Sequence, residues 1–181
     1  MAIDAGAVVR IAERTGPGNG AFAARVSFGD QTEHDLEITD PGDAESENRL
    51  AWYFEKHLRF PFLDKDLEQQ AVKQITTYGR NLFAQVFGGK ANHDYQSLRE
   101  KSFDGCRIEI RGSASFQSLH WEALRDPDLP DPLAIRLPVT RRADAVASKF
   151  TVPTNAPVLR ILVVTARPDG PADIGYRTIS R

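Results

Sequence analysis

The chain has 181 residues, of which 41% are hydrophobic and 27% charged, and its formal net charge at pH 7 is −2. This composition is typical of a globular domain with its own core, and it excludes a chain-wide positive field that would recruit nucleic acid or an anionic membrane. The sequence begins without a secretion-signal pattern and has no apolar run near the roughly 20 residues of a membrane span. We therefore expect a cytoplasmic protein with no nucleic-acid partner, no membrane partner and no cofactor.

Short strands joined by turns are predicted for the first forty residues. The apolar runs at 8–12 and 22–28 flank a stretch rich in glycine at 15–20, which suits a hairpin turn. Within the second run, Phe22, Ala24, Val26 and Phe28 alternate with Ala23, Arg25 and Ser27, which is the pattern of a half-buried strand. A third strand is expected to hold Leu36 and Ile38. Together these runs predict an antiparallel meander.

Helices are predicted next. Ser46 is the expected N-cap of a helix whose apolar face carries Leu50, Tyr53, Phe54 and His57 or Leu58. Asp66 and Gln69 resemble a capping box at the start of a second helix of about 20 residues, in which apolar residues recur every three to four positions up to Gly88. A third helix is expected over 94–101.

Alternating residues predict two further strands, at 106–111 and around Leu133, Ile135 and Leu137. Cys106 is in phase with Ile108 and Ile110, so we expect a buried structural cysteine. Because it is the only cysteine, a disulfide framework and a cysteine-rich zinc site are excluded, and the scattered histidines give no metal site.

The stretch 141–157 has few large apolar residues and is expected to be a connection. After it, the nearly continuous aliphatic run at 158–166 predicts a strand buried on both faces, as in a parallel sheet covered by helices. The polar residues after this strand lie where open α/β sheets place their ligand sites.

Four stretches, taken in order, resemble the CHAT family of caspase-like cysteine peptidases (clan CD), which is related to separase and the caspases. The most specific is Ser118-Leu-His-Trp-Glu-Ala-Leu-Arg-Asp-Pro127, which is similar to the family's Leu-Pro-Trp-Glu-Leu-Leu signature with His120 at the usual proline. The others are 49–62, 132–142 and 158–181, the last resembling the first strand and loop of the caspase-like core.

The resemblance implies that a complete protein is a cysteine endopeptidase. In this family the catalytic histidine lies in a His-Phe-Ser-Gly-His-Gly-like segment and the nucleophile in a later Ala-Cys-like turn, and neither segment occurs here. The chain would then be the N-terminal, non-catalytic portion, scaffolding or regulating a catalytic core beyond Arg181. Its expected partners are that catalytic part, in the same protein or as a companion chain, and an activating protein. The resemblance also implies that Asp173, Arg177 and Arg181 help to shape a substrate pocket.

The expected fold is an α+β region over 1–142, with antiparallel strands, two or three helices and further strands. A linker over 143–157 would join it to the first strand of an α/β caspase-like sheet over 158–181. An alternative function is a standalone protein–protein interaction module without peptidase activity, docking through the apolar residues of 52–62. A small hydrolase that uses Cys106 and His120 is a third reading.

The Trp121–Glu122 pair also has two readings. The tryptophan and the acid could serve packing and capping alone. Alternatively, Glu122 could pair with an arginine and fix the linker to the caspase-like core.

Overall fold

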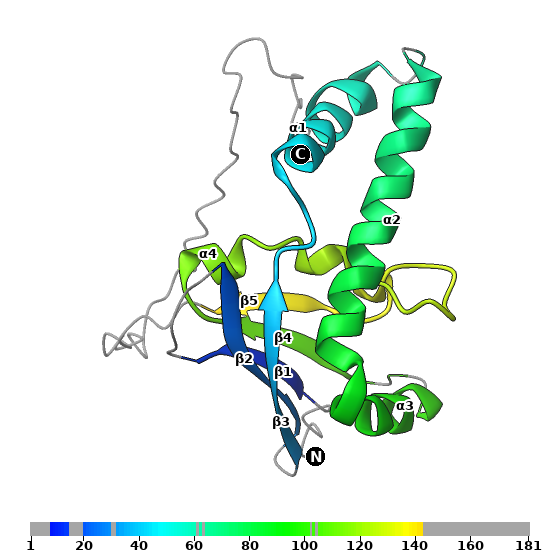
Figure 1. Ribbon diagram of the computed structural model, residues 1–181. Helices are drawn as coiled ribbons and strands as arrows, with labels where there is room; N and C mark the ends of the chain where they lie inside the picture. The colour runs from blue at the N-terminus through cyan, green and yellow to red at the C-terminus, as the bar shows by residue number, and fades with distance from the viewer. Residues whose placement is uncertain are drawn as a thin grey trace, which may run out of the picture. The chain divides into compact units, whose positions relative to one another are not determined.

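The computed structural model describes residues 8–14, 20–29, 32–60, 62, 64–101, 103 and 105–142, with the side chain of residue 59 left out. All of these residues belong to one compact unit that ends at Ala145. The described part has an α+β fold, as predicted, in which helices pack on one face of a mixed five-stranded sheet (Figure 1). The predicted linker and caspase-like strand lie outside the described residues.

The sheet combines an antiparallel meander with two parallel strands, in the order β3-β2-β1-β4-β5. The strands are β1 (Val8–Glu13), β2 (Ala21–Phe28), β3 (Thr32–Thr39), β4 (Arg107–Arg111) and β5 (Val139–Arg142). Strands β1 to β3 pair antiparallel, which confirms the predicted meander. Strand β4 pairs parallel with β1, and β5 pairs parallel with β4. Two crossovers, both containing helical segments, make these parallel pairings possible.

The first crossover, from β3 to β4, carries the longer helices. Its elements are α1 (Ala44–Ala51), a π-helical turn η1 (Trp52–Lys56), the 3₁₀ turn η2 (His57–Arg59), α2 (Lys65–Phe87), the 3₁₀ turn η3 (Gly89–Ala91) and α3 (Asn92–Glu100). The second crossover, from β4 to β5, has α4 (Ala114–Gln117) and the 3₁₀ turns η4 (Trp121–Ala123) and η5 (Leu133–Ile135). The predicted second and third helices are therefore confirmed as α2 and α3.

Both predicted helix caps were wrong by a few residues. The N-cap of α1 is Asp43, whose carboxylate accepts hydrogen bonds from the Ser46 backbone N (2.8 Å) and the Ser46 hydroxyl (2.7 Å). The N-cap of α2 is Asp64, which accepts from the Leu67 backbone N at 3.1 Å, so Asp66 lies inside the first turn. In each case a second capping residue two or three positions away was available, and the carboxylate that reached the free N–H groups became the cap.

The strand predicted around Leu133, Ile135 and Leu137 was also wrong. Leu133 begins η5, and its carbonyl accepts from the Leu137 backbone N at 2.8 Å, as in a helical turn. Leu133 and Leu137 are buried, whereas Ile135 is 73% exposed, so the three side chains do not share a face. The strand begins only at Val139, and it includes Arg141, which the sequence placed in the connection.

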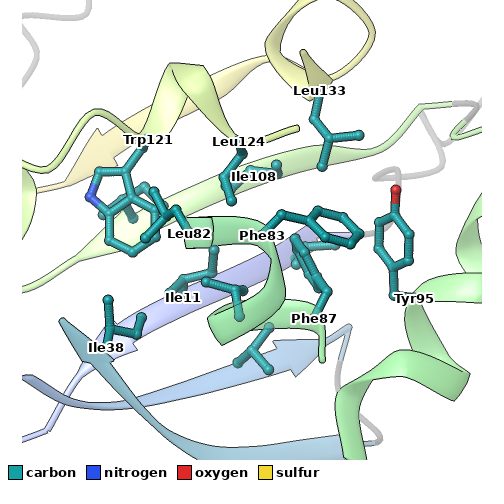
Figure 2. Close-up of a cluster of buried hydrophobic side chains, with 14 of the residues drawn as sticks. Ile11, Ile38, Leu82, Phe83, Phe87, Tyr95, Ile108, Trp121, Leu124 and Leu133 are labelled. Atoms are coloured by element: carbon teal, nitrogen blue, oxygen red, sulfur yellow. The ribbon is translucent and has the colours of Figure 1, made fainter. Parts of the chain in front are cut away.

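The core lies between the sheet and the helices. Alternate residues of the strands, among them Ile11, Ile38 and Ile108, face α2 and the segment around Trp121 (Figure 2). Phe83 and Phe87 of α2 pack against Tyr95 of α3, with ring centroids 4.9 Å and 4.7 Å apart. The buried Tyr95 hydroxyl donates to the Asp126 carboxylate at 2.7 Å, which satisfies its polar group.

Candidate functional site

The candidate site is built around the segment that carries the Trp121–Glu122 pair. Ser113 caps α4 by accepting from the Phe116 backbone N at 3.3 Å, and the chain then turns back over the sheet. Trp121 is fully buried, its Nε1 donates to the Phe116 carbonyl at 2.9 Å, and its ring lies 5.0 Å from that of Phe116. Phe116 in turn contacts Phe22 of β2 at 5.4 Å. The packing reading of the tryptophan is therefore right.

Glu122 forms a two-pronged ion pair with Arg141 of β5. Nη2 of Arg141 donates to Oε2 of Glu122 at 2.7 Å, and Nη1 donates to Oε1. The same guanidinium donates to the backbone carbonyls of Gln117 (2.9 Å) and Leu119 (3.3 Å). Burial works to raise the pKa of Glu122, but the hydrogen bonds from Arg141 outweigh it and lower the pKa. The predicted pairing of Glu122 with an arginine is thus present, and it joins the Trp121 segment to the last described strand.

Helix α2 contacts the same segment backbone to backbone at Gly79. A Cβ atom placed on Gly79 would lie 1.9 Å from the carbonyl oxygen of Ala123, which is far too close. The Gly79 carbonyl accepts from the Arg125 backbone N at 3.1 Å, and the Tyr78 hydroxyl accepts from the His120 backbone N at 3.2 Å. The sequence analysis missed Gly79, although a glycine inside a long predicted helix is a signal of such a close approach.

A cavity of about 330 Å³ opens beside this contact, between α1 with η1, helix α2 and η4. Most of its lining is apolar; the residues are Leu50, Phe54, Ile75, Tyr78, His120, Glu122, Ala123 and Pro132. At its polar side, Nε2 of His120 lies 2.9 Å from Oε1 of Glu47. Burial raises the pKa of Tyr78, so its hydroxyl stays protonated at neutral pH and can serve only as a hydrogen-bonding group.

Four large apolar side chains gather on the connection between α1 and α2. They belong to Phe54, Leu58, Phe60 and Phe62, each is more than half exposed, and Phe62 reaches 89%. We call them the hairpin tip. The sequence predicted an apolar face with Leu50, Tyr53, Phe54 and His57 or Leu58. Phe54 is exposed, and of the two alternatives His57 is buried and Leu58 is exposed, because the π-helical turn of η1 adds one residue and changes the phase of the helix. Leu50 and His57 are buried, and the side chains at the tip are left facing solvent.

The other predicted residues are not assembled into a site. Cys106 is 7% exposed and belongs to the core, as predicted, at the start of β4. His120 follows α4, beyond the other end of that strand, and lies against Glu47 and Tyr78. A five-residue strand spans about 16 Å, so this placement gives no support to a Cys106–His120 pair. Asp173, Arg177 and Arg181 lie outside the described residues.

Two features are absent from the described ranges. No group of three histidine, cysteine, aspartate or glutamate side chains there could hold a metal ion. No helix in these ranges has the length and apolar character needed to cross a membrane. Comparisons with family models, curated proteins and solved structures find no match to the chain.

Proposed function

We propose that this chain is the non-catalytic N-terminal portion of a CHAT-type caspase-like cysteine peptidase, and that it scaffolds a catalytic core encoded after Arg181. The observation that carries the proposal is the position of the Ser118 to Pro127 segment, which resembles the family signature. Its tryptophan fills the core, Glu122 holds Arg141 of β5, and its backbone lies against Gly79 of α2. The segment that resembles the signature is therefore also the one that joins the helices to the last described strand.

In this proposal, the scaffold would hold the catalytic core at the end of strand β5, where the chain leaves the sheet. Arg141 is held by Glu122 and by two backbone carbonyls, and Arg142 by Glu109. Because both side chains are tied to the unit, the end of strand β5 is held in place by side-chain hydrogen bonds. A catalytic core continuing from this point would start from an ordered anchor instead of a free end.

The proposal assigns no chemistry to the chain itself. A caspase-like mechanism needs a thiolate, a base and amides that hold the oxyanion. The single thiol of the sequence, Cys106, faces the core, so the nucleophile and the base are assigned to residues after Arg181.

The test is to express the chain together with the residues encoded after Arg181 and to assay it with a fluorogenic peptide library and a thiol-directed activity probe. We expect cleavage that is lost when the cysteine of the later turn is changed, and lower cleavage in Glu122→Gln. Glu55→Gln, at an exposed position of η1, is the matched control and should cleave normally. Coding sequence without a His-Gly turn and a Cys turn, or a complete protein that neither cleaves nor labels, would refute the proposal.

A second candidate is an interaction module without peptidase activity, favoured by the exposed hairpin tip. Large apolar side chains grouped on one surface are typical of protein contact sites. A double variant, Leu58→Ser and Phe62→Ser, should abolish capture of a specific partner by the isolated chain, whereas Ile135→Ser, an exposed apolar residue elsewhere, should not. A captured partner that is a peptidase fragment would favour the first proposal instead.

A further inference from the structure

The sheet face that points away from the helices carries a cluster of arginines around a buried acid. Glu109 of β4 is a charged residue on this face, yet it is only 3% exposed. Its Oε1 accepts from Nε of Arg10 (3.0 Å) and Nε of Arg111 (2.6 Å), and its Oε2 accepts from Nη1 of Arg142 (3.2 Å). Three strands, β1, β4 and β5, thus supply one arginine each, and we call these four residues the arginine cluster.

The arginine cluster holds more positive charge than its acid neutralises. Burial of Glu109 works to raise its pKa, but the hydrogen bonds from the three arginines dominate and lower the pKa to about 2. At neutral pH the cluster therefore has three positive charges and one negative. Arg107 lies on the same face, two residues before Glu109, and adds a further positive charge.

Among the described residues, the arginines of the cluster use few of their N–H groups. Each guanidinium has five N–H groups in a planar fork. In the described part of the chain, Arg10, Arg111 and Arg142 each donate one N–H hydrogen bond to the Glu109 carboxylate. Arg142 is 61% exposed at its side chain, and the other two are partly exposed. Guanidinium forks with spare N–H groups suit carboxylate oxygens, which they bind in pairs.

The neighbouring strands limit the size of the anion. On the same face, β3 carries Glu33, Asp35 and Glu37, and the first two are paired with Arg25 of β2. Strand β3 lies two strands from β1, about 10 Å away, which is close to one Debye length at 0.1 M salt. A long polyanion such as nucleic acid would meet this acidic half, and the whole chain is also negative, with a net charge of −2. A short anionic ligand would not.

We infer that the arginine cluster is a docking site for a short acidic segment of a partner protein, one that presents two or more carboxylates to the face of β1, β4 and β5. Its carboxylates pair with the spare guanidinium N–H groups while Glu109 holds the three arginines in place. Within the described residues, the helices and the core lie on the opposite face of the sheet.

The test measures binding of a fluorescein-labelled short polyglutamate peptide to the complete 181-residue chain by fluorescence anisotropy at about 20 mM salt, where screening is weak. Arg142→Gln should weaken binding about tenfold, because it removes one charged fork. Arg80→Gln makes the same charge change on an exposed position of α2, on the other side of the sheet, and should leave binding within about twofold.

Arg142→Gln is expected to fold, because Glu109 keeps two arginine partners, and circular dichroism checks this. Equal losses in the two variants would show a charge effect without a site and would overturn the inference. So would the absence of peptide binding at about 1 mM, a very weak affinity. Binding of single-stranded DNA as tight as that of the peptide, with the same dependence on Arg142, would also overturn it, since the face would then select no acidic protein segment.

Discussion

Gly79→Ala is the most direct test of the contact between α2 and the Trp121 segment. In an isolated helix this change stabilises by about 1 kcal/mol, because alanine has the higher helix propensity. Here the new Cβ would lie 1.9 Å from the Ala123 carbonyl oxygen, so the two backbones must separate by more than 1 Å. Overpacking of this kind costs about 1–3 kcal/mol or more, and the Arg125 N to Gly79 O hydrogen bond, worth about 1 kcal/mol, is strained as well.

We expect a net loss of about 2 kcal/mol in the free energy of unfolding, which corresponds to a fall in Tm of roughly 4–8 °C. Urea unfolding followed by tryptophan fluorescence suits the measurement, since Trp121 is buried next to the contact. Thr77→Ala, at an exposed position two residues earlier in α2, is the control and should be neutral or stabilising by a few tenths of a kcal/mol. A Gly79→Ala variant as stable as the native chain would refute the close approach of the two backbones.

Three further predictions concern individual side chains. The folded-state pKa of Glu109 is about 2, below its usual value of about 4.5, so its contribution to stability is complete above pH 4.5 and is lost as the pH falls toward 2. Glu109→Gln should flatten that part of an acid-unfolding curve. An unchanged curve would contradict the lowered pKa of Glu109. A double-mutant cycle of Glu122→Gln and Arg141→Gln should give a coupling of about 0.5–1 kcal/mol, small because both side chains are partly exposed, and zero coupling would mean that the pair does not form in solution. Iodoacetamide should label Cys106 only slowly in the folded chain and rapidly in urea, whereas rapid labelling of the folded chain would show an accessible, reactive thiol.

Periodicity predicted the elements whose local pattern agrees with their final burial. Strand β2 alternates and α2 repeats every three to four residues, and both formed as expected. The pattern failed where the spacing fits two structures. Leu133, Ile135 and Leu137 fit a strand, but Leu133 and Leu137 are also four apart, which is the spacing of a helical turn. Prolines on both sides of this segment favour a short turn over a paired strand.

The candidate site could be predicted only in part. The sequence identified Trp121 and Glu122 as a pair of interest and proposed an arginine partner, and the structure supplies Arg141. It could not identify the arginine cluster, because Glu109 in an alternating strand is expected to face solvent. Its burial depends on β1 and β5 lying on either side of β4, and the order of strands is a tertiary property that periodicity does not contain.

The central position of β1 has a consequence for how the chain folds during synthesis. Arg10 of β1 and Glu109 of β4 are 99 residues apart in sequence, so at roughly 5–20 residues per second the ribosome needs about 5–20 s to supply the second neighbour of β1. In this interval the meander has an open edge that can pair with other nascent chains. We expect ribosome-released fragments that end before β4 to aggregate, and fragments that include β5 to remain monomeric. The open edge of β1 is therefore covered only when β4 has been synthesised and has paired with it.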